Sequence, residues 1–141
     1  RRDIKSVGLL AQAMAKQAAR DAGAQEAWMV EDGFVTEGAS STAFILTEEG
    51  IVTRSYSQSV LAGCTGAAIA TLAQETGLSL IRRSFTVAEA KQAKEAFITS
   101  ASTLCQSVVR IDGETIGDGR PGPVAMRLRA LYIAFARATG V

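Results

Sequence analysis

The stretch Phe34-Val-Thr-Glu-Gly-Ala-Ser-Ser-Thr-Ala-Phe44 guides the interpretation of the whole chain. It predicts a strand that ends on one carboxylate, Glu37, followed at once by a glycine and small residues, and then a second strand from Thr42 to Leu46. Glycine and small residues allow a backbone to lie close to a ligand. The stretch therefore leaves room for a flat molecule beside a single acid that could face a cationic atom. The same residues also fit a Gly-Ser turn with a glutamate on the surface.

The composition fits one ordinary globular domain of 141 residues, long enough to bury its own core. The net charge is +1 and no basic run is visible, which argues against a nucleic-acid partner. No apolar run approaches the roughly 18–20 residues of a membrane span. Cys64 and Cys105 stand far apart in the sequence and there is no histidine, so we expect no metal site, reduced cysteines and a cytoplasmic location.

The absence of histidine also excludes Ser-His-Asp and Cys-His catalysis within this chain. Any proton transfer must therefore use Lys, Asp, Glu, Tyr or Cys, or a group from elsewhere. The chain starts with Arg1 rather than Met, and Arg1 to Lys5 resembles the middle of a protein. We therefore expect residues 1–141 to be one domain of a longer chain.

Apolar periodicity predicts helices over residues 6–21, 65–76 and 87–93 and from Pro123 onward. It predicts strands over residues 26–30, 34–37, 42–46, 51–54, 78–82, 95–99, 105–111 and 114–116. Asp-Gly or Glu-Gly turns at residues 32–33, 49–50 and 112–113 predict three hairpins among these strands. The fold class is therefore α/β with a mixed sheet rather than a uniformly parallel one.

Three helices carry predicted apolar faces, the helix over residues 65–76 through Ala68, Ile69, Leu72 and Ala73, and two helices have predicted caps. Ser6 is the expected cap of the first helix, and Thr86 with Glu89 forms a capping box for the third. The stripe of the first helix consists of Val7, Leu10, Met14 and Ala18. The core stripe of the last helix consists of Val124, Leu128, Leu131 and Phe135.

Three further places could carry chemistry. Lys5 has the apolar neighbours Ile4 and Val7, so it could point inward, where an amine has a depressed pKa and can form a Schiff base; a surface lysine is the alternative. Small residues before Thr65 leave free N–H groups at a helix start, which favour a phosphate or mark a simple cap. The hydroxyl-rich residues 99–103 follow a strand and could close a second side of an anion site, or form a solvated turn.

An amine, an acid and two phosphate-sized donor sites are together what pyridoxal 5′-phosphate requires. At this point the sequence resembles a known family. Residues 1–10, RRDIKSVGLL, and 35–44, VTEGASSTAF, resemble the fold-type IV pyridoxal-phosphate aminotransferases, and within them most the D-amino-acid aminotransferases. Residues 61–65, LAGCT, and 97–102, FITSAS, follow in the order and at the separations of that family. The resemblance covers essentially all 141 residues as the larger, C-terminal domain of such an enzyme.

The resemblance implies a partly barrel-like domain with flanking helices, and a role for each site residue. Lys5 matches the Schiff-base lysine that also moves the substrate proton, and Glu37 matches the acid that pairs with the pyridine nitrogen. The other implied cofactor contacts are the phosphate cradle Cys64 and Thr65, the second phosphate-side turn Ser100 and Ala101, the apolar neighbour of the ring Leu61, and Ser41 behind the ring.

The resemblance also implies partners and leaves the substrate open. The family has a smaller N-terminal domain that supplies further phosphate and substrate contacts, and it forms homodimers. Gly66 and Thr42 replace the family's usual Arg and Asn, Cys64 stands where isoleucine is commoner, and Leu104 and Gln106 also differ. We expect transfer of an amino group from a D-amino acid to a 2-oxo acid such as 2-oxoglutarate. A branched-chain L-amino-acid transaminase, an aminodeoxychorismate lyase or a catalytically silent binding domain remain the alternatives.

Overall fold

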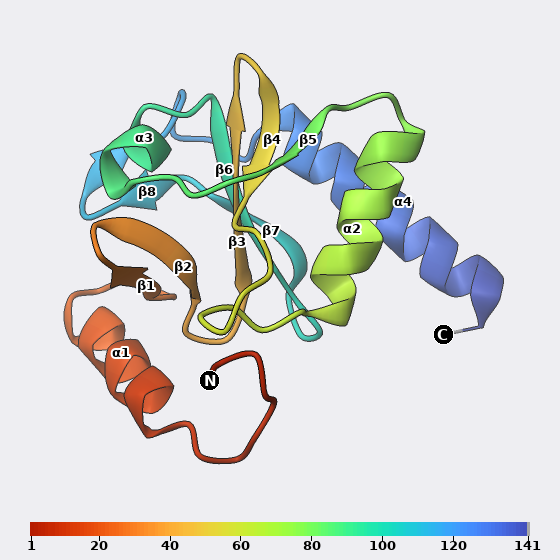
Figure 1. The fold of residues 1–141 in the computed structure, drawn as a ribbon. Coiled ribbons are helices and arrows are strands. Elements are labelled where there is room, and N and C mark those ends of the chain that lie inside the picture. The colour runs from red at the N-terminus through yellow and green to blue at the C-terminus, as the bar shows by residue number, and fades with distance from the viewer. Residues whose placement is uncertain (141) are drawn as a thin grey trace.

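A five-stranded mixed sheet lies at the centre of the computed structural model, which describes residues 1–140 (Figure 1). Its strands run in the order β5-β4-β3-β6-β7. Their bounds are β3 Thr42–Thr47, β4 Gly50–Thr53, β5 Leu80–Arg82, β6 Glu95–Ser100 and β7 Leu104–Val108. Strands β4 and β5 pair in parallel and the other neighbours pair antiparallel. The predicted mixed sheet is confirmed.

Two further hairpins accompany this sheet, β1 (Trp28–Glu31) with β2 (Phe34–Gly38) and β8 (Arg110–Ile111) with β9 (Glu114–Thr115). Both turn at an Asp-Gly pair whose two residues have positive φ, 52° and 81° in the first hairpin and 49° and 81° in the second. Positive φ at both central residues is characteristic of a type I′ turn, whose backbone twist matches that of the two strands it joins. All three predicted hairpins are therefore present, the third being β3 with β4. The predicted strand 105–111 is divided, because β7 ends at Val108 and β8 begins at Arg110.

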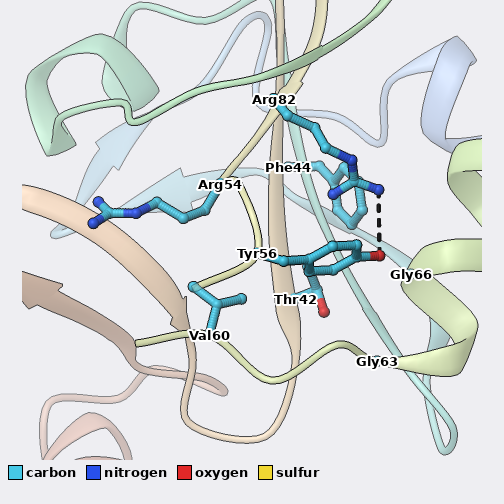
Figure 2. Close-up of a pocket in the computed structure, with 8 residues that line it drawn as sticks. All are labelled: Thr42, Phe44, Arg54, Tyr56, Val60, Gly63, Gly66 and Arg82. Carbon is cyan, nitrogen blue, oxygen red and sulfur yellow. Dashed lines mark hydrogen bonds between the residues drawn. The ribbon is translucent and has the colours of Figure 1, made fainter. Parts of the chain in front are cut away.

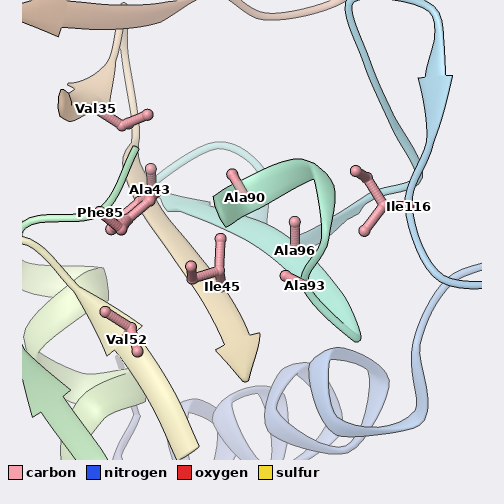
Figure 3. Packing of buried hydrophobic residues seen from close by; sticks show 9 residues of the cluster. All are labelled: Val35, Ala43, Ile45, Val52, Phe85, Ala90, Ala93, Ala96 and Ile116. Carbon is pink, nitrogen blue, oxygen red and sulfur yellow. The ribbon is translucent and has the colours of Figure 1, made fainter. Parts of the chain in front are cut away.

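Apolar residues cover both faces of the sheet because neighbouring residues of a strand point to opposite sides. On one face, Ala43 and Ile45 join a buried cluster with Phe85 and with residues of α3 (Val87–Lys91), as Figure 3 shows. On the other face, Phe44 stacks on Phe97 with 5.0 Å between ring centroids. Helices α2 (Cys64–Glu75) and α4 (Pro123–Thr139) cover this second face. The start of α2 is therefore held directly against the sheet.

Local sequence signals placed two of the helix starts correctly. Thr86 Oγ1 accepts a hydrogen bond of 3.1 Å from the Glu89 N–H, which caps α3 as predicted. Pro123 is the first residue of α4. The predicted core stripe of α4 is only partly right: Leu128 is fully buried, whereas the Phe135 side chain is 49% exposed.

The prediction for the first helix is wrong in its start and in its buried face. Helix α1 spans Leu10–Asp21 and has no side-chain cap, so Ser6 does not cap it. Gly8 follows Ser6, and glycine disfavours helix. The predicted stripe lies open, with Leu10 74% and Met14 65% exposed, because no element among residues 1–140 packs over it. The periodicity thus identified an apolar face that the described part of the chain leaves uncovered.

No helix among residues 1–140 combines the length and the apolar character that crossing a membrane would need.

Candidate functional site

Several strand ends and one helix start meet at a single edge of the central sheet. Thr42 at the start of β3 pairs with Thr99 near the end of β6. Strand β4 ends beside β3, and its last residue pairs with Arg82, the last residue of β5. Helix α2 begins at the same edge, since ideal Cβ positions at Gly63 and Gly66 would lie 3.2 and 3.3 Å from Thr42 Oγ1. Loops at this edge therefore hold most of the predicted site residues.

Glu37 is the acid of this edge. It is only 6% exposed, and its Oε2 accepts a hydrogen bond of 2.8 Å from the Leu61 N–H. Its other oxygen, Oε1, makes no hydrogen bond with residues 1–140. Burial raises the pKa of Glu37 above its ordinary value, although the Leu61 N–H and the Arg2 charge partly oppose the shift. Glu37 is therefore a buried acid with one oxygen free to accept a hydrogen bond from a cationic donor.

Ser41, the predicted small polar residue behind the ring, bonds to Glu26 rather than to Glu37. Its Oγ donates to Glu26 Oε2 at 3.0 Å, and Ser40 Oγ donates to the same oxygen at 3.2 Å. Gly38 makes this turn possible, because a Cβ at that position would lie 2.0 Å from Ser41 Oγ. Glu26 was missed in the sequence because only the folded turn brings it to serines 14 and 15 residues away.

The start of α2 presents free donors. Gly63 is its N-cap, and no side chain accepts a hydrogen bond from the first turn. The N–H groups of Cys64, Thr65 and Gly66 therefore lack intrahelical partners and point out of the N-terminal end of α2. Cys64 is exposed and Thr65 is buried at this end. A helix start of this kind favours an anion.

Thr99 places a second unused donor beneath this helix start. Its side chain is 2% exposed, and its Oγ1 is the one buried side-chain polar atom among residues 1–140 that has no hydrogen-bond partner. A Cβ at Gly66 would lie 3.1 Å from that oxygen. Unpaired buried hydroxyls are costly and uncommon. The register of β3 with β6 brings Thr99 here, and that register is not readable from local sequence.

The turn between β6 and β7 is hydroxyl-rich, as predicted, but its hydroxyls bond mainly to one another. Ser100 Oγ lies 2.7 Å from Thr103 Oγ1 and 3.2 Å from Ser102 Oγ, and it accepts a bond from the Thr103 N–H. Ala101 is exposed at the tip of this turn. Figure 1 shows the turn beside the start of α2, and Thr99 just before it approaches Gly66. The two predicted phosphate-side segments are therefore neighbours.

Lys5 is exposed in the described part of the chain, which corresponds to the surface alternative rather than to an inward-facing amine. Its neighbours Ile4 and Val7 are 55% and 101% exposed and form no apolar pocket around it. The segment is nevertheless anchored near the acid. The Arg2 N–H donates to Gln58 O at 2.8 Å, and the Arg2 charge acts on Glu37. Lys5 thus lies three residues beyond a residue that is electrostatically coupled to Glu37.

A small hollow adjoins the start of α2, and Figure 2 shows the residues that line it. Its volume of about 10 Å³ is room for about one water molecule. Arg82 stacks over the Tyr56 ring in the lining of this hollow, and Gly63 and Gly66 line it as well. No group of three or more metal-ligating side chains occurs among residues 1–140. The edge therefore joins a buried acid to a region of N–H and cationic donors.

This distribution of charge fits pyridoxal 5′-phosphate, which has a ring nitrogen that becomes cationic and a phosphate that is anionic. Glu37 offers a free acceptor oxygen for the first, and the start of α2 offers unpaired donors for the second. The glycines at positions 63 and 66 keep side chains away from that helix start. The donors present therefore suit such a group.

Comparisons with known proteins agree with this fit. The chain is 40% identical over 127 residues to a D-alanine aminotransferase of Bacillus licheniformis and 36% identical to one of Staphylococcus haemolyticus. Each match covers 90% of this chain, and the chain spans only 45% of either relative. A branched-chain amino acid aminotransferase from Thermobaculum terrenum, solved in its PLP-form, superposes with a TM-score of 0.90 at 26% identity, over 95% of this chain and 45% of that one.

The Escherichia coli branched-chain amino acid aminotransferase superposes with a TM-score of 0.85 at 28% identity, covering 89% of this chain and 43% of that structure. The family model described as amino-transferase class IV matches residues 1–111. The chain therefore belongs to the class IV amino-transferase family.

Proposed function

We propose that the full-length protein is a pyridoxal-phosphate-dependent transaminase that moves the amino group of a D-amino acid to a 2-oxo acid. The D-alanine aminotransferases at 33–40% identity support this substrate class. The chain spans 45% of those relatives, so the remaining contacts to substrate belong to residues outside it. We expect those residues to form a smaller N-terminal domain, with the whole protein acting as a cytoplasmic homodimer.

Four groups of residues hold the cofactor in this proposal. Glu37 Oε1 accepts a hydrogen bond from the ring nitrogen, and Leu61 packs near the ring while its N–H orients the carboxylate. The N–H groups at Cys64 and Thr65, together with the turn at Ser100 and Ala101, receive the phosphate. Ser41 acts indirectly, because its bond to Glu26 fixes the turn that follows Glu37.

Lys5 performs the proton transfer in this proposal. Pyridoxal phosphate, when bound, supplies an electron sink that makes the hydrogen on the substrate Cα acidic. The Lys5 Nζ, once neutral, takes that proton from the substrate Cα and later delivers it to the cofactor carbon. Glu37, ionised by a cationic partner, keeps a proton on the ring nitrogen. Residues 1–141 contain no histidine that could replace Lys5 in this role.

The observation that carries the proposal is the bond between Glu37 Oε2 and the Leu61 N–H. It ties the acid to the short connector that leads, three residues later, into the donor-rich start of α2. A buried carboxylate with one free oxygen is unfavourable unless a cation approaches it. The connector therefore fixes the two chemically opposite ends of one site.

The test uses the full-length protein with D-alanine and 2-oxoglutarate, assayed for pyruvate. The proposal predicts pyruvate formation, its loss in Lys5→Ala, and its retention in Lys16→Ala, a control on exposed helix α1. Pyruvate formation that survives Lys5→Ala would reject the role of Lys5. Full activity with L-leucine and none with D-alanine would reject the D-amino-acid assignment.

The second candidate is a branched-chain L-amino-acid transaminase. The solved structures that superpose with TM-scores of 0.84–0.90 include branched-chain amino acid aminotransferases, which supports this alternative. Sequence identity favours the first candidate, since those structures reach 26–32% and the Bacillus licheniformis relative reaches 40%. The same assay with L-leucine in place of D-alanine separates the two.

A further inference from the structure

Arg82 is an exposed cation that stacks on an exposed tyrosine ring at the edge of the site. Its guanidinium carbon lies 4.2 Å from the centroid of the Tyr56 ring, and its Nη2 donates to the Tyr56 hydroxyl at 3.3 Å. No carboxylate lies within 4.0 Å of the guanidinium among residues 1–140. Stacking fixes the flat face of the guanidinium while leaving N–H groups at its edge free. The Tyr56 oxygen accepts from Arg82, so its own O–H remains free to donate.

This stacked pair lies on the side of the hollow that faces the start of α2. Figure 2 shows the Tyr56 hydroxyl and the Arg82 guanidinium toward Gly66, whereas the Arg54 guanidinium points the opposite way. Gly63 and Gly66 line the same hollow and carry no side chains that would fill it. No acidic residue is among those lining it. The surroundings of Arg82 therefore contain donors and no anion.

The buried hydroxyl of Thr99 is a further donor that would suit an anionic ligand. Its Oγ1 has no partner and lies against Gly66, in the first turn of α2. Backbone N–H groups and a guanidinium thus lie at one helix start without an acceptor, and the unpaired Thr99 hydroxyl lies beneath its first turn. Convergent donors of this kind are how proteins bind phosphate groups.

We propose that Arg82, positioned by Tyr56, binds the phosphate of the cofactor from the β5 side of α2. This inference rests on the proposed function, because it assigns an additional contact within the same site. The hollow itself is too small for a phosphate, so the group lies at its rim, between the edge of the guanidinium and the first turn of α2. Arg82 adds positive charge to the end of the site that Glu37 does not occupy, which favours one orientation of the ligand.

The test measures equilibrium binding to the cofactor-free, full-length protein for two ligands, pyridoxal 5′-phosphate and pyridoxal, which lacks the phosphate. Arg82→Gln should weaken binding of the phosphate ester about tenfold, the loss expected for one hydrogen bond to a charged group, and change binding of pyridoxal less than about twofold. It should also weaken competition by inorganic phosphate. The matched control is Arg54→Gln, which removes the same charge from the same hollow at a side chain that points away.

Two conservative variants separate a phosphate contact from a structural role. Arg82→Lys keeps the charge and should retain most of the affinity, and Tyr56→Phe keeps the stacked ring but not the hydroxyl, so its loss should be intermediate. Equal affinities for Arg82→Gln and Arg54→Gln would overturn the inference, and so would equal losses for the two ligands. If the wild-type protein binds the phosphate ester through Lys5 while Arg82→Gln has no effect, the proposed function stands and only this inference falls. A wild-type protein that binds neither ligand would overturn both.

Discussion

Glu95 stabilises the start of α4 from 29 residues away, and its replacement allows a quantitative prediction. The side chain is 8% exposed. Its Oε1 accepts from the Val124 N–H and its Oε2 from the Ala125 N–H, each at 3.0 Å. Gly122 leaves the space that the carboxylate fills, since a Cβ there would lie 2.1 Å from Glu95 Cδ. Glu95 thus acts as the cap that the sequence near Pro123 does not provide.

Glu95→Ala removes two charged hydrogen bonds, each of which contributes about 1.5–3 kcal/mol. Water can replace part of this loss, because Gly122 and Val124 are only half-buried. We therefore expect the free energy of unfolding to fall by about 3 kcal/mol, near the lower limit of the summed range. Glu95→Gln keeps one acceptor oxygen but turns a donor NH2 toward the other N–H, so it should lose about 2 kcal/mol, including the interaction of the charge with the helix dipole.

The assay is urea unfolding of the full-length protein, with hydrogen exchange at the Val124 and Ala125 amides as a local readout. Glu75→Ala is the matched control, because Glu75 is exposed at the end of α2 and its loss should change the free energy of unfolding by less than about 0.5 kcal/mol. A Glu95→Ala protein that loses less than about 1 kcal/mol, with amide exchange unchanged, would refute the assignment of Glu95 as the cap of α4.

Three further outcomes are expected. Burial raises the pKa of Glu37 above its ordinary 4.5, so the folded protein holds a proton that the unfolded chain releases. The free energy of unfolding without cofactor should therefore fall as the pH rises from 4.5 through the folded pKa. Thermal unfolding of Glu37→Gln should not show this pH dependence. Gly38→Ala would place a Cβ 2.0 Å from Ser41 Oγ, so it should cost about 1–2 kcal/mol, and less in a Ser41→Ala background; equal costs in urea unfolding would contradict the contact. Burial raises the pKa of the Cys105 thiol to about 12, so iodoacetamide should label exposed Cys64 and spare Cys105, as peptide mass mapping would show; comparable labelling rates would contradict this burial.

The features that the sequence predicted correctly depend on local chemistry. Asp-Gly pairs permit positive φ at both turn residues, so the hairpins could be placed without knowing the fold. Thr86 accepts from an N–H three residues away, and Pro123 acts through its own ring. The starts of α3 and α4 could therefore also be predicted from neighbouring residues alone. The strand from Thr42 to Leu46 was also predicted, and both of its faces are buried.

The features that the sequence did not predict depend on distant partners. The stripe of α1 was read as buried, but an apolar face shows only that a partner is needed and not where that partner lies. The partner of Ser41 proved to be Glu26, which lies in the segment just before β1. Thr99 lay within the predicted residues 99–103, whereas Arg82 comes to this edge of the sheet through the register of β4 with β5, which no local signal specifies. Glu37 was identified because its neighbours are small, a property that is local.

In the proposed function, Lys5 and Glu37 act on opposite ends of one bound pyridoxal phosphate. The most direct test is to load the full-length protein with pyridoxal phosphate, reduce it with borohydride, and locate the modified residue by peptide mass mapping in the wild-type protein and in Glu37→Ala. Lys5 should be labelled in the wild type, whereas Lys16, Lys91 and Lys94 should remain unlabelled. Labelling of Lys5 should be weaker in Glu37→Ala. Labelling of another lysine, or equal labelling of Lys5 in the wild type and in Glu37→Ala, would contradict these roles of Lys5 and Glu37.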